Sequence, residues 1–176
     1  MSAAAGAVRG ALIFALTGLL GYSVWALAGR RLSEPVLYAA IAAVFLVLPP
    51  LAGGPLVEGP SPRRRFALAF LPAFLAYAAA WCGAWFSMKS KTGEWLGSAA
   101  GCAAFALVSA AVLGGWRRLP AAALVLFAAH SAGYFAGDRA FAALGHSKTG
   151  MLAWGVLHGA GLGTGIGALF RMLSRR

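Results

Sequence analysis

Acidic residues are almost absent from this sequence. Its 176 residues include four Asp and Glu, against 15 Lys and Arg. So few carboxylates exclude, within an apolar region, the paired-acid sites of glycosidases, carboxylate bundles that hold two iron ions, and calcium-binding loops. The sequence therefore points away from reactions that need several carboxylates in one site.

Charged residues of both signs are also scarce. They make up 11% of the chain, whereas hydrophobic residues make up 61%. A typical soluble domain is about one quarter charged and about half apolar. The composition therefore predicts an all-α integral membrane protein, with one transmembrane domain over residues 1–176.

Cysteine is limited to Cys82 and Cys102, and both lie inside apolar runs. The two residues form no CxxC pair, zinc-finger spacing or haem-attachment motif. The simplest interpretation is two buried thiols that pack as small hydrophobic side chains.

Six apolar runs of 17 to 21 residues follow one another along the chain, each near the length of about 20 residues that a helix needs to cross a bilayer. The runs are continuously apolar, which predicts helices and not the alternating strands of a membrane barrel. Pro35 and Pro120 begin two of them, at first-turn positions where a missing N–H costs nothing. The predicted spans are Gly10–Ala28, Pro35–Leu51, Phe66–Phe86, Trp95–Leu113, Pro120–Ala136 and Met151–Phe170.

Lys and Arg are distributed unevenly over the two sides that six spans define. Because cytoplasmic loops carry the excess of these residues, both termini are predicted in the cytoplasm, in a bacterial-type inner membrane or a plasma membrane. The cations on the side of the termini are Arg9, Arg63, Arg64, Arg65, Arg117, Arg118, Arg171, Arg175 and Arg176. Those on the opposite side are Arg30, Arg31, Lys89, Lys91, Arg139 and Lys148.

A net charge of +11 would indicate nucleic-acid binding in a soluble chain. Here the topology rule accounts for the charge, and no RNA- or DNA-binding motif is present. Arg63, Arg64 and Arg65 are expected as cytoplasmic anchors that also hold anionic lipid headgroups. Membrane lipids, and not nucleic acids, are therefore the predicted partners.

A short segment occurs twice. Ser90-Lys91-Thr92-Gly93 precedes the fourth span, and Ser147-Lys148-Thr149-Gly150 precedes the sixth, 57 residues later. Small residues then recur in register, and the preceding helices align once seven residues are inserted. The pattern predicts two or three helical hairpins in the same orientation, related by an axis along the membrane normal.

The repeated segment also predicts helix starts. Thr92 and Thr149 are expected as N-cap residues, whose helices begin on the non-cytoplasmic side. With Lys91 and Lys148 beside them, these two helix starts suit an anion or a lipid phosphate. The alternative is plain capping, with lysines that extend toward the membrane surface.

The sixth span is rich in glycine at four-residue spacing, from Gly155 to Gly167. Such GxxxG pairs allow close packing of helix backbones, within the bundle or between protomers. They fit a homo-oligomer or a subunit of a larger membrane complex. The alternative is a flexible helix that lines a substrate path, with Thr164 on it.

His130 and His158 are the ionisable residues inside the spans, which makes them functional candidates. A rise of 1.5 Å per residue places His130 about 9 Å and His158 about 10 Å from the outer ends of their helices. Cys82 and Cys102 fall in the same layer, so a site for a soft metal or haem is geometrically allowed. The alternative is separate hydrogen-bonded histidines and packed thiols.

Aromatic residues gather in the outer half of the predicted bundle. One explanation of this clustering is an anchor at the outer membrane surface. The alternative explanation, which is functional, is an outward-facing cavity for a lipid, quinone, pigment or organic cation. The residues are Trp25, Trp81, Trp85, Trp95, Trp154, Tyr22, Tyr38 and Tyr134.

Three functions remain open at this point. The first is a small permease or channel for an anionic or amphiphilic solute, and the second a noncatalytic subunit of a membrane complex. A metal- or haem-binding protein or a lipid-processing enzyme, using Asp138, His146, Glu94 and Glu34, is the third, and no cofactor is specified. The permease prediction assigns substrate binding to His130, His158, Ser131, Thr164, Lys91 and Lys148.

Overall fold

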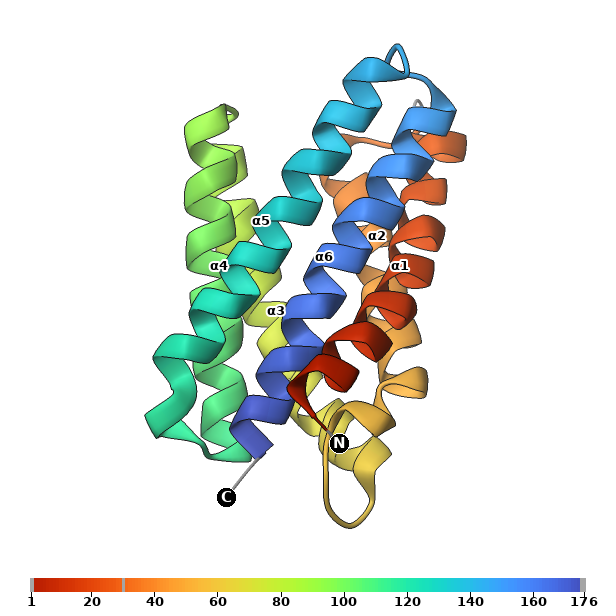
Figure 1. Cartoon of the computed structure of the whole chain (residues 1–176). Coiled ribbons are helices and arrows are strands. Elements are labelled where there is room, and N and C mark those ends of the chain that lie inside the picture. The colour runs from red at the N-terminus through yellow and green to blue at the C-terminus, as the bar shows by residue number, and fades with distance from the viewer. Residues whose placement is uncertain (1, 30, 175–176) are drawn as a thin grey trace.

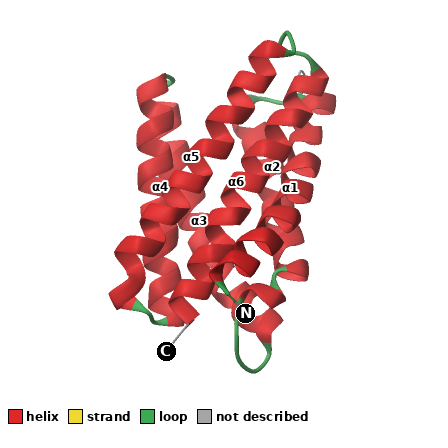
Figure 2. Cartoon of the chain, viewed as in Figure 1, coloured by secondary structure: helices red, strands yellow, loops and turns green. Residues whose placement is uncertain are grey.

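The computed structural model describes residues 2–29 and 31–174, and this part of the chain is all helical (Figures 1 and 2). Six of its helices are long and apolar enough to cross a membrane, which confirms the predicted number and type of elements. Two short 3-10 helices, Gly54–Leu56 and Trp116–Arg118, lie in connections. The long helices are α1 (Ala3–Ala28), α2 (Glu34–Ala52), α3 (Pro62–Met88), α4 (Lys91–Leu113), α5 (Leu119–Ala143) and α6 (Lys148–Ser174).

The helices extend beyond the predicted spans. Helix α1 begins seven residues before Gly10, and α5 ends seven residues after Ala136. Hydropathy ends a span where charge begins, as at Arg9, but a helix continues until its backbone groups are capped. The Ser2 hydroxyl supplies such a cap, because it accepts a hydrogen bond from the Ala5 N–H at 3.2 Å.

The predicted caps of α4 and α6 are wrong by two positions. The Ser90 hydroxyl accepts from the Gly93 N–H at 3.2 Å, and the Ser147 hydroxyl accepts from the Gly150 N–H at 3.2 Å. Thr92 therefore lies in the first turn of α4, as Thr149 does in α6. Serine is the cap because its hydroxyl reaches the N–H three residues later, the position that an N-cap side chain bonds.

The two repeated segments adopt the same local structure. Lys89 and His146 are both left-handed, with φ of 41° and 55°. A Cβ atom placed on Gly93 would lie 3.1 Å from the Ala84 carbonyl oxygen, and one on Gly150 would lie 3.1 Å from that of Phe141. All of these pairs are 57 residues apart, although α3 ends at Met88 and α5 already at Ala143, so that the second turn is longer.

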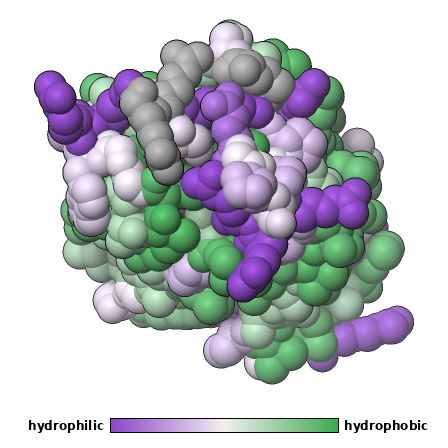
Figure 3. Space-filling model, turned by 90° about the horizontal axis from the view of Figure 1, so that it is seen from below, coloured by the Kyte–Doolittle hydropathy of each residue, from purple (hydrophilic) through white to green (hydrophobic). Residues whose placement is uncertain are grey.

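Both termini lie at one end of the bundle (Figure 1), which we call the terminal end. The hairpins α1–α2, α3–α4 and α5–α6 turn at the opposite, hairpin end, through residues 29–33, 89–90 and 144–147. Figure 3 views the terminal end, where hydrophilic residues are spread among apolar ones.

Helix α6 lies between α1 and α5 (Figure 1). Its glycines bring the backbones together: a Cβ atom on Gly159 would lie 2.0 Å from the Phe14 carbonyl oxygen of α1. On another face, a Cβ on Gly161 would lie 2.4 Å from the Ala129 carbonyl oxygen of α5. No larger residue fits these positions without separating the helices.

Aromatic rings fill the core toward the terminal end. Phe66, Phe70 and Phe74 stack along α3, with centroids 5.2 and 5.4 Å apart. Below them the buried Arg171 of α6 donates hydrogen bonds to the Glu58 carboxylate and the Pro55 carbonyl in the α2–α3 connection. The interior of the bundle is therefore packed toward the terminal end, and grooves of 1380 and 490 Å³ lie at its surface there.

Candidate functional site: an aromatic cavity at the hairpin end

Two histidines meet in the interior of the bundle. The ring centroids of His130 in α5 and His158 in α6 are 5.2 Å apart, and the ring planes are nearly perpendicular. His130 is fully buried and His158 is 9% exposed. The two rings thus lie at a similar depth, as the helical rise predicts. They also face each other, which the depth alone does not determine.

Each histidine shares a hydrogen bond with a tyrosine from another helix. The Tyr77 hydroxyl of α3 lies 2.6 Å from His130 Nε2, and the Tyr22 hydroxyl of α1 lies 3.1 Å from His158 Nδ1. The second nitrogen of each ring, His130 Nδ1 and His158 Nε2, is buried without a hydrogen-bond partner among the described residues. The pair therefore joins four helices and keeps unused polar capacity in the core.

Tyr134 connects the histidines to a layer of indoles. Its ring centroid lies 5.4 Å from His158, 5.4 Å from Trp154 and 5.8 Å from Trp81. These contacts are edge-to-face, the arrangement that the charge distribution of aromatic rings favours. The result is a rigid aromatic wall above the histidine pair.

A small cavity of 110 Å³, the inner cavity, adjoins His158, whereas His130 lines none of the described cavities. It lies among α1, α2, α3, α5 and α6, and its wall is almost entirely apolar or aromatic. The lining residues are Tyr22, Tyr38, Ile41, Ala42, Phe45, Phe74, Tyr77, Ala78, Trp81, Cys82, Tyr134, His158 and Leu162.

A larger cavity of 510 Å³, the vestibule, lies between the inner cavity and the hairpin end. Gly29, Leu32 and His146 from the connections line it, so it reaches that end of the molecule. Tyr22, Tyr38, Ile41, Trp81 and Tyr134 line both cavities, which therefore adjoin. Its aromatic wall consists of Tyr22, Trp25, Tyr38, Trp81, Trp85, Tyr134, Phe141 and Trp154.

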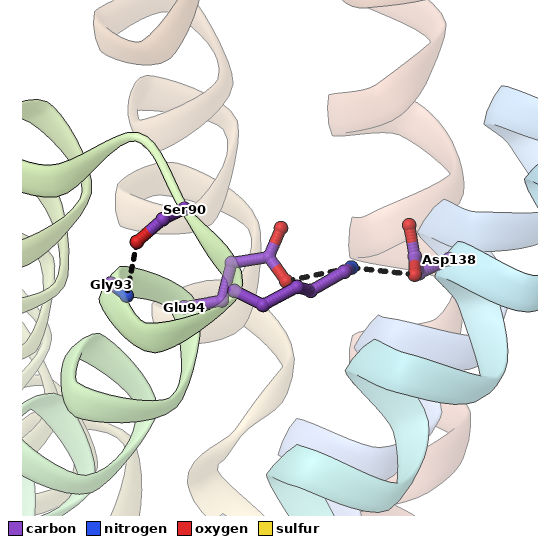
Figure 4. A network of polar contacts seen from close by, with 5 residues as sticks. Ser90, Gly93, Glu94 and Asp138 are labelled. Atoms are coloured by element: carbon purple, nitrogen blue, oxygen red, sulfur yellow. Dashed lines mark hydrogen bonds and ion pairs between the residues drawn. The ribbon is translucent and has the colours of Figure 1, made fainter.

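Three acidic residues line the vestibule: Glu34, Glu94 and Asp138. Lys91 Nζ bridges two of them, at 2.9 Å from Glu94 Oε2 and 2.8 Å from Asp138 Oδ2 (Figure 4). Glu34 accepts hydrogen bonds from Lys89 Nζ at 2.7 Å and from the Trp85 indole at 3.2 Å. No Lys or Arg is found among the described residues that line the vestibule itself.

The other predicted substrate-binding residues lie apart from this site. Ser131 lines a separate groove of 790 Å³ on the outside of the bundle, between α4 and α5. Thr164 is half-buried and lines none of the described cavities, and the same holds for the exposed Lys148. Lys91 lines the same outer groove as Ser131, and its ammonium binds two acids of the vestibule wall.

The two cysteines lie in different surroundings. Cys82 is half-buried in the wall of the inner cavity, whereas Cys102 is buried in the apolar core. Residues 2–29 and 31–174 contain no group of three or more His, Cys, Asp or Glu that could hold a metal ion.

Sequence reasoning missed the tyrosines that hold the histidines. Tyr77 lies in the middle of a predicted span, and the sequence indicates for Tyr22 only a place among the aromatic residues of the outer half. A signal was present, because a buried tyrosine hydroxyl needs a hydrogen-bond partner and histidines are the polar residues at that depth. The facing of Glu94 and Asp138 had no comparable signal.

Comparison of the chain with protein-family models, curated proteins and solved structures gives no match. The function is therefore argued from the site alone. The site offers little support for an enzyme that uses Glu94, Asp138 and His146. Both carboxylates bind Lys91, and the His146 ring packs on Phe141, with centroids 4.7 Å apart.

Proposed function

We propose that this chain is a small integral membrane permease for an amphiphilic solute, with both termini in the cytoplasm and the hairpin end outside. The observation that carries the proposal is the pair of adjoining cavities, one at the hairpin end and one at the Tyr22–His158 contact inside the bundle. A cavity of this size, mostly aromatic with few polar groups, is typical of a small-molecule site.

The packed core between the inner cavity and the terminal end supports a carrier over an open channel. Phe45 and Phe74 stack 5.5 Å apart at the floor of the inner cavity, and the fully buried Phe70 and Phe66 follow. A solute that enters from the hairpin end meets this aromatic floor. Passage then requires a second conformation that opens the terminal end, as in alternating access.

The packing of the helices suggests an interface along which two groups of helices could move. Backbone contacts at glycines join α1, α6 and α5, and similar contacts at Gly97 and Gly101 join α4 to α3. Between α5 and the α3–α4 hairpin, the polar links are side-chain contacts, Tyr77–His130 and Lys91–Asp138. Side-chain contacts break and re-form at lower cost than interlocked backbones, so the two units are proposed to rock against each other.

Cys82 allows a test that needs no known substrate. The variant Cys102→Ala keeps Cys82, in the inner cavity, as the one thiol. A charged, membrane-impermeant methanethiosulfonate is applied to right-side-out and to inside-out vesicles, and the reaction rate is measured from each side. A carrier exposes Cys82 to both sides, so we expect reaction in both preparations and a slower rate from the terminal end.

The matched control is Cys82→Ala, which keeps the core residue Cys102, 1% exposed. This variant is expected to stay unlabelled while it remains folded. Reaction of Cys82 from the hairpin side alone, at all times and temperatures tested, would show a static binding cavity and contradict the permease.

The repeat arrangement forms part of the proposal. The equivalent turns before Ser90 and Ser147, and the equivalent contacts of Gly93 and Gly150, support a duplicated hairpin. In an experimental structure, α3–α4 is expected to superpose on α5–α6 by rotation about an axis along the bundle, with Thr92 on Thr149. An inverted relation would contradict it.

A noncatalytic subunit of a membrane complex, or a homo-oligomer, is the second candidate. The outer groove between α4 and α5 favours it, because Trp95, Phe127 and Phe135 line this groove and a partner helix would cover them. Cross-linking of a cysteine placed at Trp95 distinguishes the two, since a subunit with a partner there gives a defined product.

Anionic lipids are proposed at the terminal end. Arg63 lines a groove of 490 Å³ there, with Arg9 and Arg171, and Arg65 lines a neighbouring one. Their charges suit lipid phosphates at a cytoplasmic surface. Arg64 belongs to the same run of the sequence.

A further inference from the structure

We infer that the vestibule binds organic cations, a substituted or quaternary ammonium group attached to an apolar or aromatic body. The inference deepens the proposed function, because it names the class of solute that the same site takes. It replaces the anionic solute that the repeated lysines favour in the sequence.

The first observation is the sorting of charge. The chain has 15 Lys and Arg and four acids, yet three of those acids line the vestibule and none of its described lining residues is Lys or Arg. In a chain so rich in cations, a random wall would be basic. Two lysines outside this lining, Lys91 and Lys89, form ion pairs with the acids. Three carboxylates therefore face two ammonium groups, and the remaining negative charge favours a cation over an anion.

The second observation is the kind of surface between the acids. Eight aromatic side chains line the vestibule, four of them tryptophans. The face of an indole ring is negative and attracts a cation, most strongly when water is excluded. Aromatic walls together with carboxylates are the recognised surroundings of ammonium ligands, whereas an anion would meet repulsion from both.

The third observation is that an ammonium from the neighbouring outer groove, that of Lys91, already binds two of the vestibule acids. Lys91 Nζ lies between Glu94 and Asp138, within 2.9 Å of an oxygen of each. The Glu94 side chain is only 9% exposed, so its carboxylate requires a cation nearby. The Lys91 side chain is 62% exposed, and it can therefore swing into water when a ligand ammonium takes its place.

The inner cavity adds a polar contact below the ammonium position. His158 is nine-tenths buried in its wall, and its Nε2 has no partner among the described residues. A ligand whose apolar body enters this cavity meets one unused polar atom there. A hydroxyl or ether group on that body would satisfy it.

The test compares two water-soluble probes of similar shape and opposite charge, phenyltrimethylammonium and benzenesulfonate. Binding to the purified, full-length protein in detergent is measured by isothermal titration calorimetry, with tryptophan emission as a second readout. We expect saturable binding of phenyltrimethylammonium, a change in tryptophan emission, and no binding of benzenesulfonate.

Two variants must move the affinity in opposite directions. Glu94→Gln removes a wall charge and is expected to weaken binding of phenyltrimethylammonium about tenfold. Lys91→Gln removes the internal competitor and is expected to strengthen it at a pH where the carboxylates stay ionised. A folding defect cannot produce this gain. Glu58→Gln, an acid at the terminal end, is the matched control and should leave the affinity unchanged.

Equal binding of both probes, preference for benzenesulfonate, absence of phenyltrimethylammonium binding to folded protein, or weaker binding by Lys91→Gln would overturn the inference. The permease proposal fails separately. Saturable cation binding together with one-sided labelling of Cys82 would retain this site and reject transport, and two-sided labelling without cation binding would do the reverse.

Discussion

The Tyr77 hydroxyl lies 2.6 Å from His130 Nε2, and it is the hydrogen-bond partner that this fully buried imidazole has in the described chain. The bond links α3 to α5 at the depth of the inner cavity. One short contact thus holds a polar ring in the core and joins the two units that we propose to move.

Removal of that hydroxyl should destabilise the fold. In Tyr77→Phe, His130 is left with neither nitrogen bonded, which costs about 1–3 kcal/mol of unfolding free energy. Tyr22→Phe removes the longer, partly exposed contact to His158, 3.1 Å, and should cost less. Unfolding in mixed detergent measures both, and an unchanged midpoint for Tyr77→Phe would contradict the assigned role.

Replacement of the glycine at the tightest helix contact should be harmful. A Cβ on Gly159 would lie 2.0 Å from the Phe14 carbonyl oxygen, so Gly159→Ala must separate α6 from α1, at about 1–3 kcal/mol or more. Gly83, in α3, has no described atom within 4 Å of such a Cβ. Gly83→Ala should therefore stabilise its helix by about 0.5–1 kcal/mol.

Thermal unfolding in detergent, followed by circular dichroism, compares these two alanine variants. Opposite shifts are expected from the same chemical change. Equal shifts would mean that the backbone contact between α1 and α6 contributes nothing measurable.

Thiol labelling in cells tests the orientation. In a background without native cysteines, Lys148→Cys at the hairpin end should react with an impermeant maleimide from outside, whereas Arg64→Cys at the terminal end should not. The excess of cations on the terminal side is the physical reason. The reverse pattern would place the vestibule on the cytoplasmic side.

Much of the fold follows from local rules. The apolar runs predict six helices because hydrocarbon tolerates only backbones that satisfy their own hydrogen bonds. The helix ends follow less well: the runs stop at charges such as Arg9, whereas the backbone stops at caps such as Ser2. At the starts of α4 and α6, serine and threonine are both good cap residues, and the structure places Ser90 and Ser147 in that position.

The site follows only in part. Rise per residue brings His130 and His158 to one depth, but the rotation of each helix about its axis depends on the glycine contacts with its neighbours. For the same reason, the outer position of Glu94 and Asp138 is predictable and their inward facing is not. Ser131 illustrates the converse, since it neighbours His130 in sequence yet lines the outer groove between α4 and α5.

The contact between the first and the last helix governs how the chain can be assembled. Gly10 and Gly163 meet backbone to backbone across some 150 residues of sequence, so α1 leaves the ribosome long before α6 exists. Until then its glycine face has no native partner, and such a long-range contact is slow to form. Biogenesis of the bundle therefore ends with the closure of α6 onto α1, and chains that stop short of α6 are expected to be recognised as unfinished and degraded.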